Sequence, residues 1–311
     1  MRAITKAGTM TATLAVTALL VSACGGGGEG TDTAETGDAL APVPTETFDV
    51  QKDEKLAAQL PDSIKKAGAI NIAGAAGSAP DVFVDEKGEL VGWEIDLVKA
   101  AADKFGVKPK FNEISFDSVI PGLQADRYDI AFGQIGITNE RMKKIDQVGT
   151  ALGNQGIAAT SDSDIKVESL NDLCGKKVAT TRGSRQQEFG DTQSKKCVDD
   201  GNPAVEMQVY DDGTKANMAM LSGRADVSWS GSTGMNYFVA NSQGKAKIVG
   251  HYLEPYPMGG ALPKGSDFSK PFAASINSLI ADGTYAKIMD KWGLADNEIN
   301  KVEVNPTVKD Q

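Results

Sequence analysis

The chain has 311 residues and a formal net charge of −10 at pH 7. A chain this acidic, without a basic run, is a poor nucleic-acid binder, because nothing offsets repulsion from the phosphates. After Pro61 roughly 250 residues remain, which is enough for two ordinary domains. No apolar stretch long enough to span a bilayer follows Cys24.

The first 23 residues have the pattern of a targeting segment. Arg2 and Lys6 make a basic start, and an apolar core follows at 14–21. Val21-Ser-Ala-Cys24 resembles a bacterial lipobox, so we expect residues 1–23 to be a lipoprotein signal peptide and Cys24 to carry lipid. The protein would then be anchored on the extracytoplasmic face of the cell membrane, as in a Gram-positive bacterium. An ordinary cleaved signal that contains a cysteine remains the alternative.

Residues 24–61 are rich in Gly, Thr, Ala, Glu and Pro, and Phe48 is their one aromatic residue. A segment of this composition buries too little apolar surface to fold. The sequence therefore predicts a disordered tether up to about Pro61.

The stretch from Gly88 to Arg141 alternates turn, helix, strand, helix and strand. Strands are expected at 110–114 and 129–133, and Asp117 or Ser118 can cap the helix between them. Because helices and strands alternate, a parallel sheet follows. The first helix, ended by Gly106, has apolar residues three or four apart: Ile95, Val98, Ala101, Ala102 and Phe105.

The second half of the chain repeats this order. Strands are expected at 176–181, 205–210, 226–230 and 246–249, and helices start after Ser184 and Asp212. Two further helices are expected at 269–282 and 284–292. The pattern predicts a second α/β lobe.

Cys174 and Cys197 are the two cysteines that remain once Cys24 is assigned to lipid. An even pair in an exported chain favours one disulfide bond. Two free thiols or a metal pair is the alternative, although the spacing is not that of a zinc site.

The ordered motifs resemble those of the extracellular solute-binding proteins of ABC importers, family 3, the polar amino-acid branch. They are Gly92-Trp93-Glu94-Ile95-Asp96-Leu97, Ile120-Pro121-Gly122-Leu123, Asp129-Ile130, Thr138-Asn-Glu-Arg141 and the closing run from Asp282 to Gly293. Together they cover the chain from about Ile64 to Leu294.

The resemblance implies an α/β fold with two lobes, the type II periplasmic-binding-protein fold, in which each lobe is a mostly parallel sheet flanked by helices. Lobe 1 is expected at 62–155 and 251–311, and lobe 2 at 156–250. Two crossover strands would form a hinge, with the ligand between the lobes at the strand ends.

Arg141 lies in the first turn of an expected helix, where a cation is unfavourable with respect to the helix dipole. This position suggests a guanidinium that holds a ligand carboxylate, with surface pairing to Glu140 or Asp146 as the alternative. Ser184 and the N–H groups that follow it form a helix N-terminus suited to an anion. Phe116 resembles the family's aromatic residue that packs on the ligand, although a core role is equally possible, and Trp93 is the second candidate aromatic.

The expected ligand contacts combine these residues with their neighbours at the strand ends: Ser78, Asp81, Trp93, Phe116, Gln134, Gly136, Thr138, Arg141, Thr181, Ser184, Arg185, Gln186, Ser230 and Ser232.

The departures from the family pattern concern the ligand's ammonium group. The acid that holds it in the family aligns near Gly231, where this chain has no carboxylate. An unpaired buried charge is costly, so Asp81 or Glu94 would have to replace that acid, or the ligand is not a standard amino acid. Arg182 and Arg185 are either further anion contacts or solvated surface.

The resemblance implies a monomer that delivers a small, possibly carboxylate-bearing solute to a permease and its ATPase. No cofactor or metal motif is visible. A sensing lipoprotein for a membrane receptor is the alternative function, followed by a dehydratase-like enzyme. Against the enzyme, no catalytic set can be assembled around the single histidine, His251.

Overall fold

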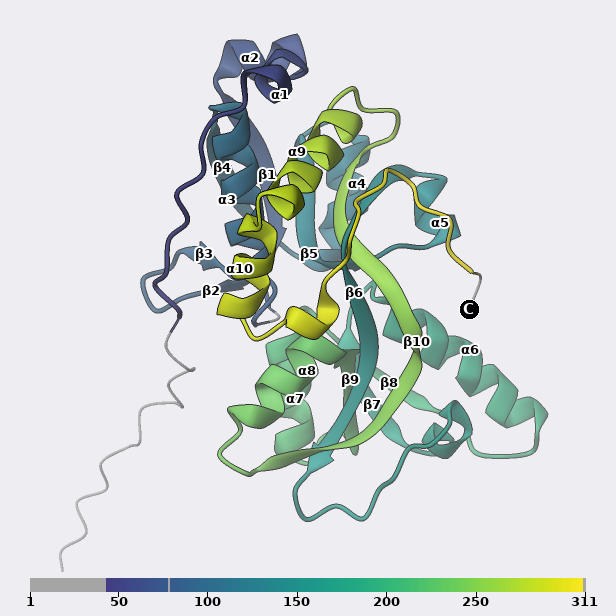
Figure 1. Cartoon of the computed structure of the whole chain (residues 1–311). Coiled ribbons are helices and arrows are strands. Elements are labelled where there is room, and N and C mark those ends of the chain that lie inside the picture. Colours follow the sequence, from purple (N-terminus) through teal and green to yellow (C-terminus); the bar gives the residue numbers. More distant parts are fainter. Residues whose placement is uncertain (1–42, 78, 310–311) are drawn as a thin grey trace, which may run out of the picture. The chain divides into compact units, whose positions relative to one another are not determined.

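The computed structural model describes residues 43–77 and 79–309, which belong to one compact unit. Its centre is an eight-stranded sheet with the order β4-β1-β5-β10-β6-β9-β7-β8 (Figure 1). The strands are β1 (Ala69–Ala75), β4 (Lys108–Ile114), β5 (Ile130–Gly136), β6 (Ile145–Thr160), β7 (Lys177–Thr181), β8 (Glu206–Tyr210), β9 (Val227–Gly231) and β10 (Ala246–Pro263), and a hairpin adds β2 (Phe83–Val84) and β3 (Leu90–Val91).

The outer strands are parallel, as the alternation of helices and strands predicts. β1 pairs in parallel with β4 and β5, and β7 pairs in parallel with β8 and β9. Within the eight-stranded sheet, the two central strands, β6 and β10, pair antiparallel with each other and with their neighbours β5 and β9. The sheet therefore consists of two mostly parallel parts joined by β6 and β10.

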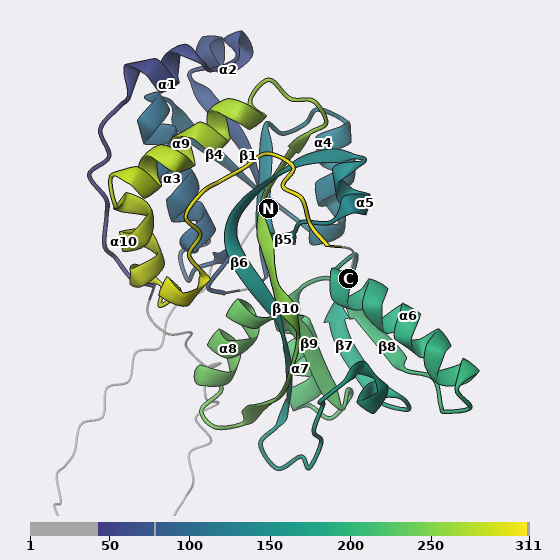
Figure 2. The ribbon, with the colours of Figure 1, turned by 45° about the vertical axis from the view of Figure 1, so that its right-hand side comes forward.

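We call the part built on β1, β4 and β5 the first lobe and the part built on β7, β8 and β9 the second lobe. Figures 1 and 2 show β6 and β10 running side by side from one lobe into the other. The two-lobe α/β fold is confirmed. The residue boundaries expected for the lobes stay a prediction.

Helices cover both faces of each part of the sheet. In the first lobe they are α1 (Glu54–Ala58), α2 (Asp62–Ala67), α3 (Trp93–Phe105), α4 (Val119–Gln124), α5 (Asn139–Met142), α9 (Ser269–Ala281) and α10 (Thr284–Lys291). In the second they are α6 (Arg185–Asp199), α7 (Gly213–Leu221) and α8 (Ser232–Ala240). Short 3₁₀ turns stand at Phe116–Ser118, Leu170–Leu173 and Ala295–Asn297.

α3 shows how the sequence determines one of these helices. Its apolar face is buried, with Ile95, Val98 and Phe105 at 0 to 1% exposure. Gly106 ends it in the left-handed conformation, at φ 71°, which glycine adopts without steric cost. That face packs into the main core with α9 and α10.

The N-terminal part of the described chain corrects the expected tether. Asp53 caps α1 through Lys55 N and Leu56 N, and Leu56 and Leu60 are 7% and 3% exposed within the main core. Phe48 packs against the same core. The folded part therefore begins well before Pro61, because α1 rests on α3 and α9.

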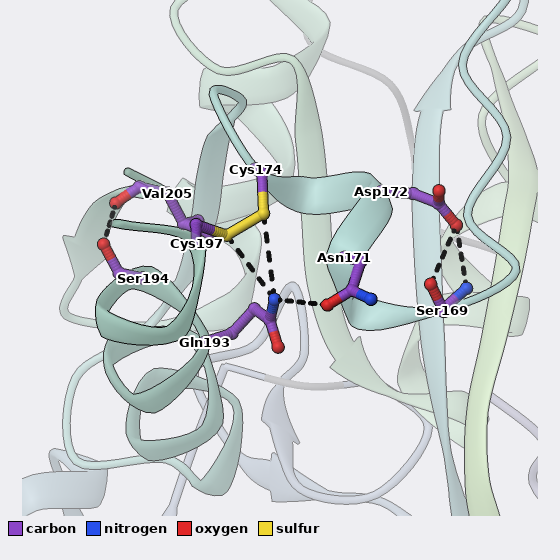
Figure 3. The surroundings of a disulfide bond; sticks show 8 residues. All are labelled: Ser169, Asn171, Asp172, Cys174, Gln193, Ser194, Cys197 and Val205. Atoms are coloured by element: carbon purple, nitrogen blue, oxygen red, sulfur yellow. Dashed lines mark hydrogen bonds between the residues drawn. A yellow bond between two sulfur atoms is a disulfide. The ribbon is translucent and has the colours of Figure 1, made fainter. Parts of the chain in front are cut away.

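The expected disulfide joins Cys174 to Cys197 and ties α6 to the turn at Leu170–Leu173 (Figure 3). Gln193 Nε2 lies 3.4 Å from Cys197 Sγ and donates to Asn171 Oδ1 at 2.9 Å. Cys197 is buried in the second lobe's core. The bond thus fixes the outer end of α6 in the second lobe.

Among the described residues, no helix is long and apolar enough to cross a membrane. Cys24, the expected lipid attachment site, and the expected signal peptide 1–23 lie outside the described residues.

Candidate functional site

A pocket of about 530 Å³, its open mouth included, lies where strands of both lobes end. The first lobe contributes the ends of β1 and β5, and the second contributes the ends of β7 and β9 with the N-termini of α6 and α7. The lining residues are Ala75, Ala76, Gly77, Phe116, Gly133, Gln134, Gly136, Arg141, Thr181, Ser184, Arg185, Gln186, Asp212, Gly213, Ser230 and Tyr256.

Many of the residues expected from the sequence come together in this lining. They are Phe116, Gln134, Gly136, Arg141, Thr181, Ser184, Arg185, Gln186 and Ser230. Strand ends explain the agreement, since parallel strands deliver their C-terminal residues to one edge of the sheet. Contact between these side chains and a ligand stays a prediction.

Four expected residues stand outside the lining. Asp81 and Trp93 are fully buried behind it, and Trp93 Nε1 donates to Asp81 Oδ1 at 2.7 Å. Thr138 caps α5 by accepting from Arg141 N at 3.1 Å, and Ser232 Oγ accepts from Asn154 N at 3.3 Å. In this structure these four residues support the lining without forming part of it, and their contact with a ligand stays a prediction. Ser78 lies outside the described residues.

Arg141 connects the two lobes at the pocket. Its Nη1 donates to Gly136 O at 2.8 Å, its Nη2 donates to Gly183 O at 3.3 Å, and its guanidinium lies 5.6 Å from the Phe116 ring. Burial, and then the nearby Arg185, lower the pKa of Arg141 to about 10. The side chain therefore stays cationic at neutral pH and faces a pocket rather than a surface partner.

Arg185 is the second cation of the pocket, and at 8% exposure it is not the solvated surface residue that the sequence left open. Its guanidinium lies 4.5 Å from the Tyr256 ring and 4.9 Å from the Phe189 ring. Burial lowers the pKa of Arg185 and raises that of Tyr256 to about 12. The aromatic rings position this guanidinium at the N-terminus of α6.

Ser184, after which the sequence predicts a helix, caps the N-terminus of α6. Ser184 Oγ accepts from Gln187 N at 3.2 Å, but Gln187 Oε1 accepts from Gly183 N rather than from Ser184 N. Gln186 Nε2 donates to Gln155 Oε1 at 2.6 Å, and Gln155 Nε2 donates to Tyr256 Oη at 2.7 Å. This chain of hydrogen bonds couples α6 to the two strands that join the lobes.

Glu94 is fully buried beside the pocket without lining it. Its Oε2 accepts from Gln134 N at 2.9 Å, while its Oε1 has no hydrogen-bond partner among the described residues. Burial, and then the neighbouring Asp81, raise the pKa of Glu94 from 4.5 to about 8. Neither Asp81 nor Glu94 lines the pocket in this structure, and pairing of one of them with a ligand ammonium stays a prediction.

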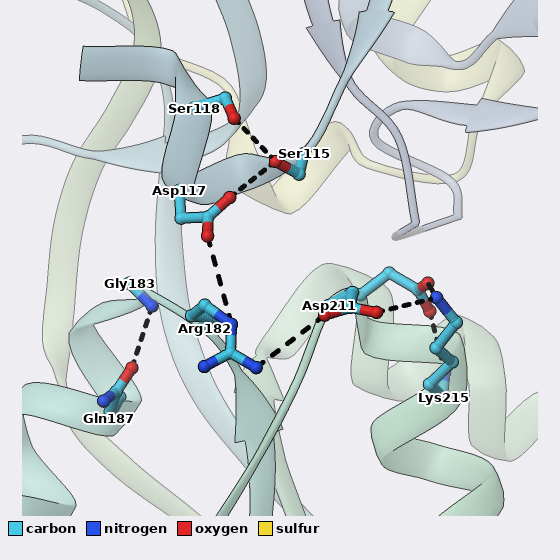
Figure 4. Close-up of polar contacts among 9 residues, drawn as sticks. Ser115, Asp117, Ser118, Arg182, Gly183, Gln187, Asp211 and Lys215 are labelled. Carbon is cyan, nitrogen blue, oxygen red and sulfur yellow. Dashed lines mark hydrogen bonds and ion pairs between the residues drawn. The ribbon is translucent and has the colours of Figure 1, made fainter. Parts of the chain in front are cut away.

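Arg182 lies at the rim and bridges the lobes through exposed contacts (Figure 4). Its Nε is 3.9 Å from Asp117 Oδ2 of the first lobe, and its Nη2 is 3.8 Å from Asp211 Oδ1 of the second. Because all three side chains are largely exposed, solvent screens these ion pairs. Arg182 thus lies at the rim, which agrees with the alternative that it is a solvated surface residue.

The sequence prediction missed several lining residues: Ala75, Ala76, Gly77, Gly133, Asp212, Gly213 and Tyr256. The strand-end rule applies to the first three, since they end or follow β1, whereas Gly133 lies within β5. Asp212 was expected only as a helix cap, and it does cap α7 by accepting from Lys215 N at 2.8 Å. Nothing local distinguishes Tyr256, which reaches the pocket from β10.

Within residues 43–77 and 79–309, no cluster of three or more His, Cys, Asp or Glu side chains is placed to hold a metal ion. The pocket lining offers guanidinium groups, hydroxyls, amides, aromatic rings and the carboxylate of Asp212. Such a lining suits recognition of a small polar molecule.

Comparisons with known proteins agree with this geometry. Arginine-binding protein ArgT of Corynebacterium glutamicum is 26% identical over 253 residues, covering 81% of this chain and 83% of that protein. L-cystine-binding protein TcyA of Bacillus subtilis is 23% identical, over 82% of this chain and 92% of its own. An ancestral arginine-binding protein, solved with arginine bound, matches with a TM-score of 0.66 and 33% identity, covering 72% of this chain and 98% of that one.

Residues 70–295 match the sequence profile of the bacterial extracellular solute-binding proteins, family 3. The match includes both lobes and the strands that join them. The chain therefore belongs to the bacterial extracellular solute-binding proteins, family 3.

Proposed function

We propose that this protein captures a small amino-acid-type solute between its lobes and delivers it to the permease and ATPase of an ABC importer. The observation that carries the proposal is Arg141, a cation at the pocket wall whose guanidinium contacts carbonyl groups of both lobes. Such a guanidinium binds a carboxylate through charge-assisted hydrogen bonds. Relatives named for arginine, cystine and amino-acid ABC transport support this class of solute.

The ligand carboxylate would lie between Arg141 and the N-terminus of α6, which Ser184 caps. There the N–H groups of the first turn and the helix dipole favour an anion. Phe116 and Tyr256 line the same pocket and provide flat apolar surface for the rest of the solute.

Binding and release would use β6 and β10 as a hinge. These two strands carry the chain between lobes, and Arg141 and Arg182 make contacts across the cleft. Ligand binding favours the closed arrangement because each lobe supplies part of the lining. The closed form would be the one that the permease recognises.

We further propose that Cys24 is lipidated and holds the protein on the outside of the cell membrane, as its lipobox-like sequence indicates. Fractionation of cells that express the full chain should find it in the membrane, and a Cys24→Ser variant should lose that attachment. Equal membrane retention of both proteins would refute lipidation at this cysteine.

Transport and sensing differ in what the bound solute does next. Once a thermal-shift screen has found a ligand, uptake of the labelled ligand should fall when the gene is deleted and return with the wild-type chain. Unchanged uptake, together with loss of a transcriptional response to the ligand, would favour the sensing role. The matching relatives are named as binding proteins, which supports binding rather than catalysis.

A further inference from the structure

The pocket of the proposed binding protein has an excess of positive charge. Arg141 and Arg185 line it, and Asp212 is the one carboxylate among its lining residues. Asp212 Oδ1 already accepts from Lys215 N at 2.8 Å, and its Oδ2 lies 3.1 Å from Lys215 Nζ. A solute with a net negative charge fits this lining better than a cationic one.

A side chain at position 231 could add a second carboxylate at this corner of the pocket. The space that it would need is occupied by Gln134 of the first lobe. A Cβ at position 231 would lie 2.5 Å from Oε1 and Cδ of Gln134. The carboxamide of Gln134 therefore occupies the space beside the Gly231 backbone. A neutral amide stands where the pocket would need an acid to pair with an ammonium group.

Gln134 is held in this position from two sides. Its backbone N donates to Glu94 Oε2 at 2.9 Å, and its Nε2 donates to Thr233 Oγ1. Thr233 Oγ1 lies 3.0 Å from both carboxylate oxygens of Asp81, so its single proton is donated there while it accepts from Gln134. The hydroxyl of Thr233 thus fixes the amide with its nitrogen bound and its oxygen left as an acceptor.

Asp81 is separated from the pocket by the same network. Trp93 Nε1 and Thr233 Oγ1 both hydrogen-bond to its carboxylate, which is fully buried at the N-terminus of α8. Its Oδ1 accepts from Trp93 Nε1 at 2.7 Å, and both of its oxygens lie 3.0 Å from Thr233 Oγ1. The acid that could balance an ammonium is therefore engaged by protein groups instead.

We propose that the pocket selects small carboxylates that lack a free α-ammonium group, such as N-acylated amino acids or 2-oxo acids, and that Gln134 is the specificity-determining residue. The inference rests on the proposed function, since it assigns the substrate class of the same site. A free ammonium would be buried beside two guanidinium groups with a neutral amide as its neighbour. An acylated nitrogen or a keto oxygen carries no charge and avoids this repulsion.

Calorimetric titration of the purified chain with matched sets tests the proposal. Each set shares one side chain: L-glutamine, N-acetyl-L-glutamine and the corresponding 2-oxo acid, then L-arginine with its two counterparts. In at least one set, the N-acetyl or 2-oxo member should bind ten times or more tightly than the free amino acid. The proposal would be overturned if, in every set that binds, the free amino acid bound as tightly as its two counterparts or more tightly. Asp212 would then be the acid that pairs with the ammonium group.

A pair of variants tests the corner itself. Gln134→Ala/Gly231→Asp opens the space and adds a carboxylate, and Gln134→Ala/Gly231→Asn is its neutral, nearly isosteric control. The first should bind the free amino acids at least ten times more tightly than the second, after melting curves show that both fold. Equal affinities would show that the ligand nitrogen does not reach this corner, which overturns the proposal. If either variant fails to fold, the titrations of the wild-type protein with the matched sets test the proposal on their own.

The outcomes separate this inference from the proposed function. If free amino acids bind more tightly than their counterparts and Arg141→Ala abolishes this binding, the proposed function is supported and the proposed substrate class is wrong. Absence of binding by every member of the sets would contradict both.

Discussion

The protein places two pairs of ionisable side chains close to its pocket, one facing the pocket and one buried behind it. Arg141 and Arg185 face the pocket, and the pKa of Arg141, lowered to about 10, keeps it charged at neutral pH. Asp81 and Glu94 lie behind the pocket, and the pKa of Glu94 is raised to about 8. Burial of an ionisable side chain therefore does not show that it lines the pocket, because only the two arginines face the pocket.

The acidic pair should be visible in the pH dependence of stability. Between pH 4.5 and 8 the folded protein keeps the Glu94 proton while the unfolded chain releases it, so the free energy of unfolding falls as pH rises. The fall for this group is at most about 1.4 kcal/mol per pH unit. Denaturant titrations of wild type and Glu94→Gln should therefore diverge progressively across this window.

The glutamine variant has no such proton, so its advantage should grow with pH up to about 8 and then level off. Asp103→Asn is a suitable control, since Asp103 also has a raised pKa but stands on the outer side of α3, away from Glu94. Parallel curves for wild type and Glu94→Gln would show that Glu94 is ionised in the folded protein.

Removal of the disulfide bond should lower the stability of the protein without changing its affinity for ligand. Cys174→Ser/Cys197→Ser opens a loop with a separation of 23 residues and should cost about 3 kcal/mol in the chain-entropy account. Because the bond lies in the core of the second lobe and not at the pocket, ligand affinity of the folded variant should change little. A large loss of affinity at unchanged stability would mean that the bond shapes the site.

Arg141→Ala should remove the basic pair's main contact with the ligand. A charge-assisted hydrogen bond contributes roughly 1.5 to 3 kcal/mol, so affinity should fall about tenfold or more. The free protein should still fold, because Arg141 lies at the pocket wall on the short helix α5 and outside the hydrophobic core, and its loss removes two hydrogen bonds to backbone carbonyls. Lys143→Ala, on the exposed side of the same segment, is the matched control and should bind normally.

The smallest effect is expected at the rim. Arg182→Ala removes two ion pairs of 3.8 and 3.9 Å between exposed side chains, which together contribute less than about 1 kcal/mol. Affinity measured at low salt should drop less than fivefold, and the difference should shrink as salt screens the charges. A tenfold loss that persists at high salt would assign Arg182 to the ligand instead.

Local pattern predicted those parts of the fold that local chemistry controls. The apolar spacing of α3, the glycine that ends it and the Asp212 cap of α7 were all visible in the sequence. The helix α1 was missed because its burial depends on α3 and α9, far along the chain. Composition alone therefore set the start of the folded part too late.

The sequence also predicted part of the site. Helix N-termini pointed to Arg141 and Ser184, and the end of the strand expected at 129–133 pointed to Gln134; all three line the pocket. The role of Asp81 was not predictable, because its partner Thr233 stands 152 positions away and belongs to the other lobe. A sequence shows that a carboxylate is present, but only tertiary structure shows which groups already satisfy it.

The most direct test of the account is a thermal-shift screen of wild type and Arg141→Ala against amino acids, their N-acyl derivatives, 2-oxo acids, small dicarboxylates and sugars. A ligand at about a hundred times its Kd should add about 2.7 kcal/mol to the free energy of unfolding. The account predicts that at least one carboxylate raises the melting temperature of wild type and that the variant loses this response. A response confined to sugars, or one that Arg141→Ala retains in full, would contradict it.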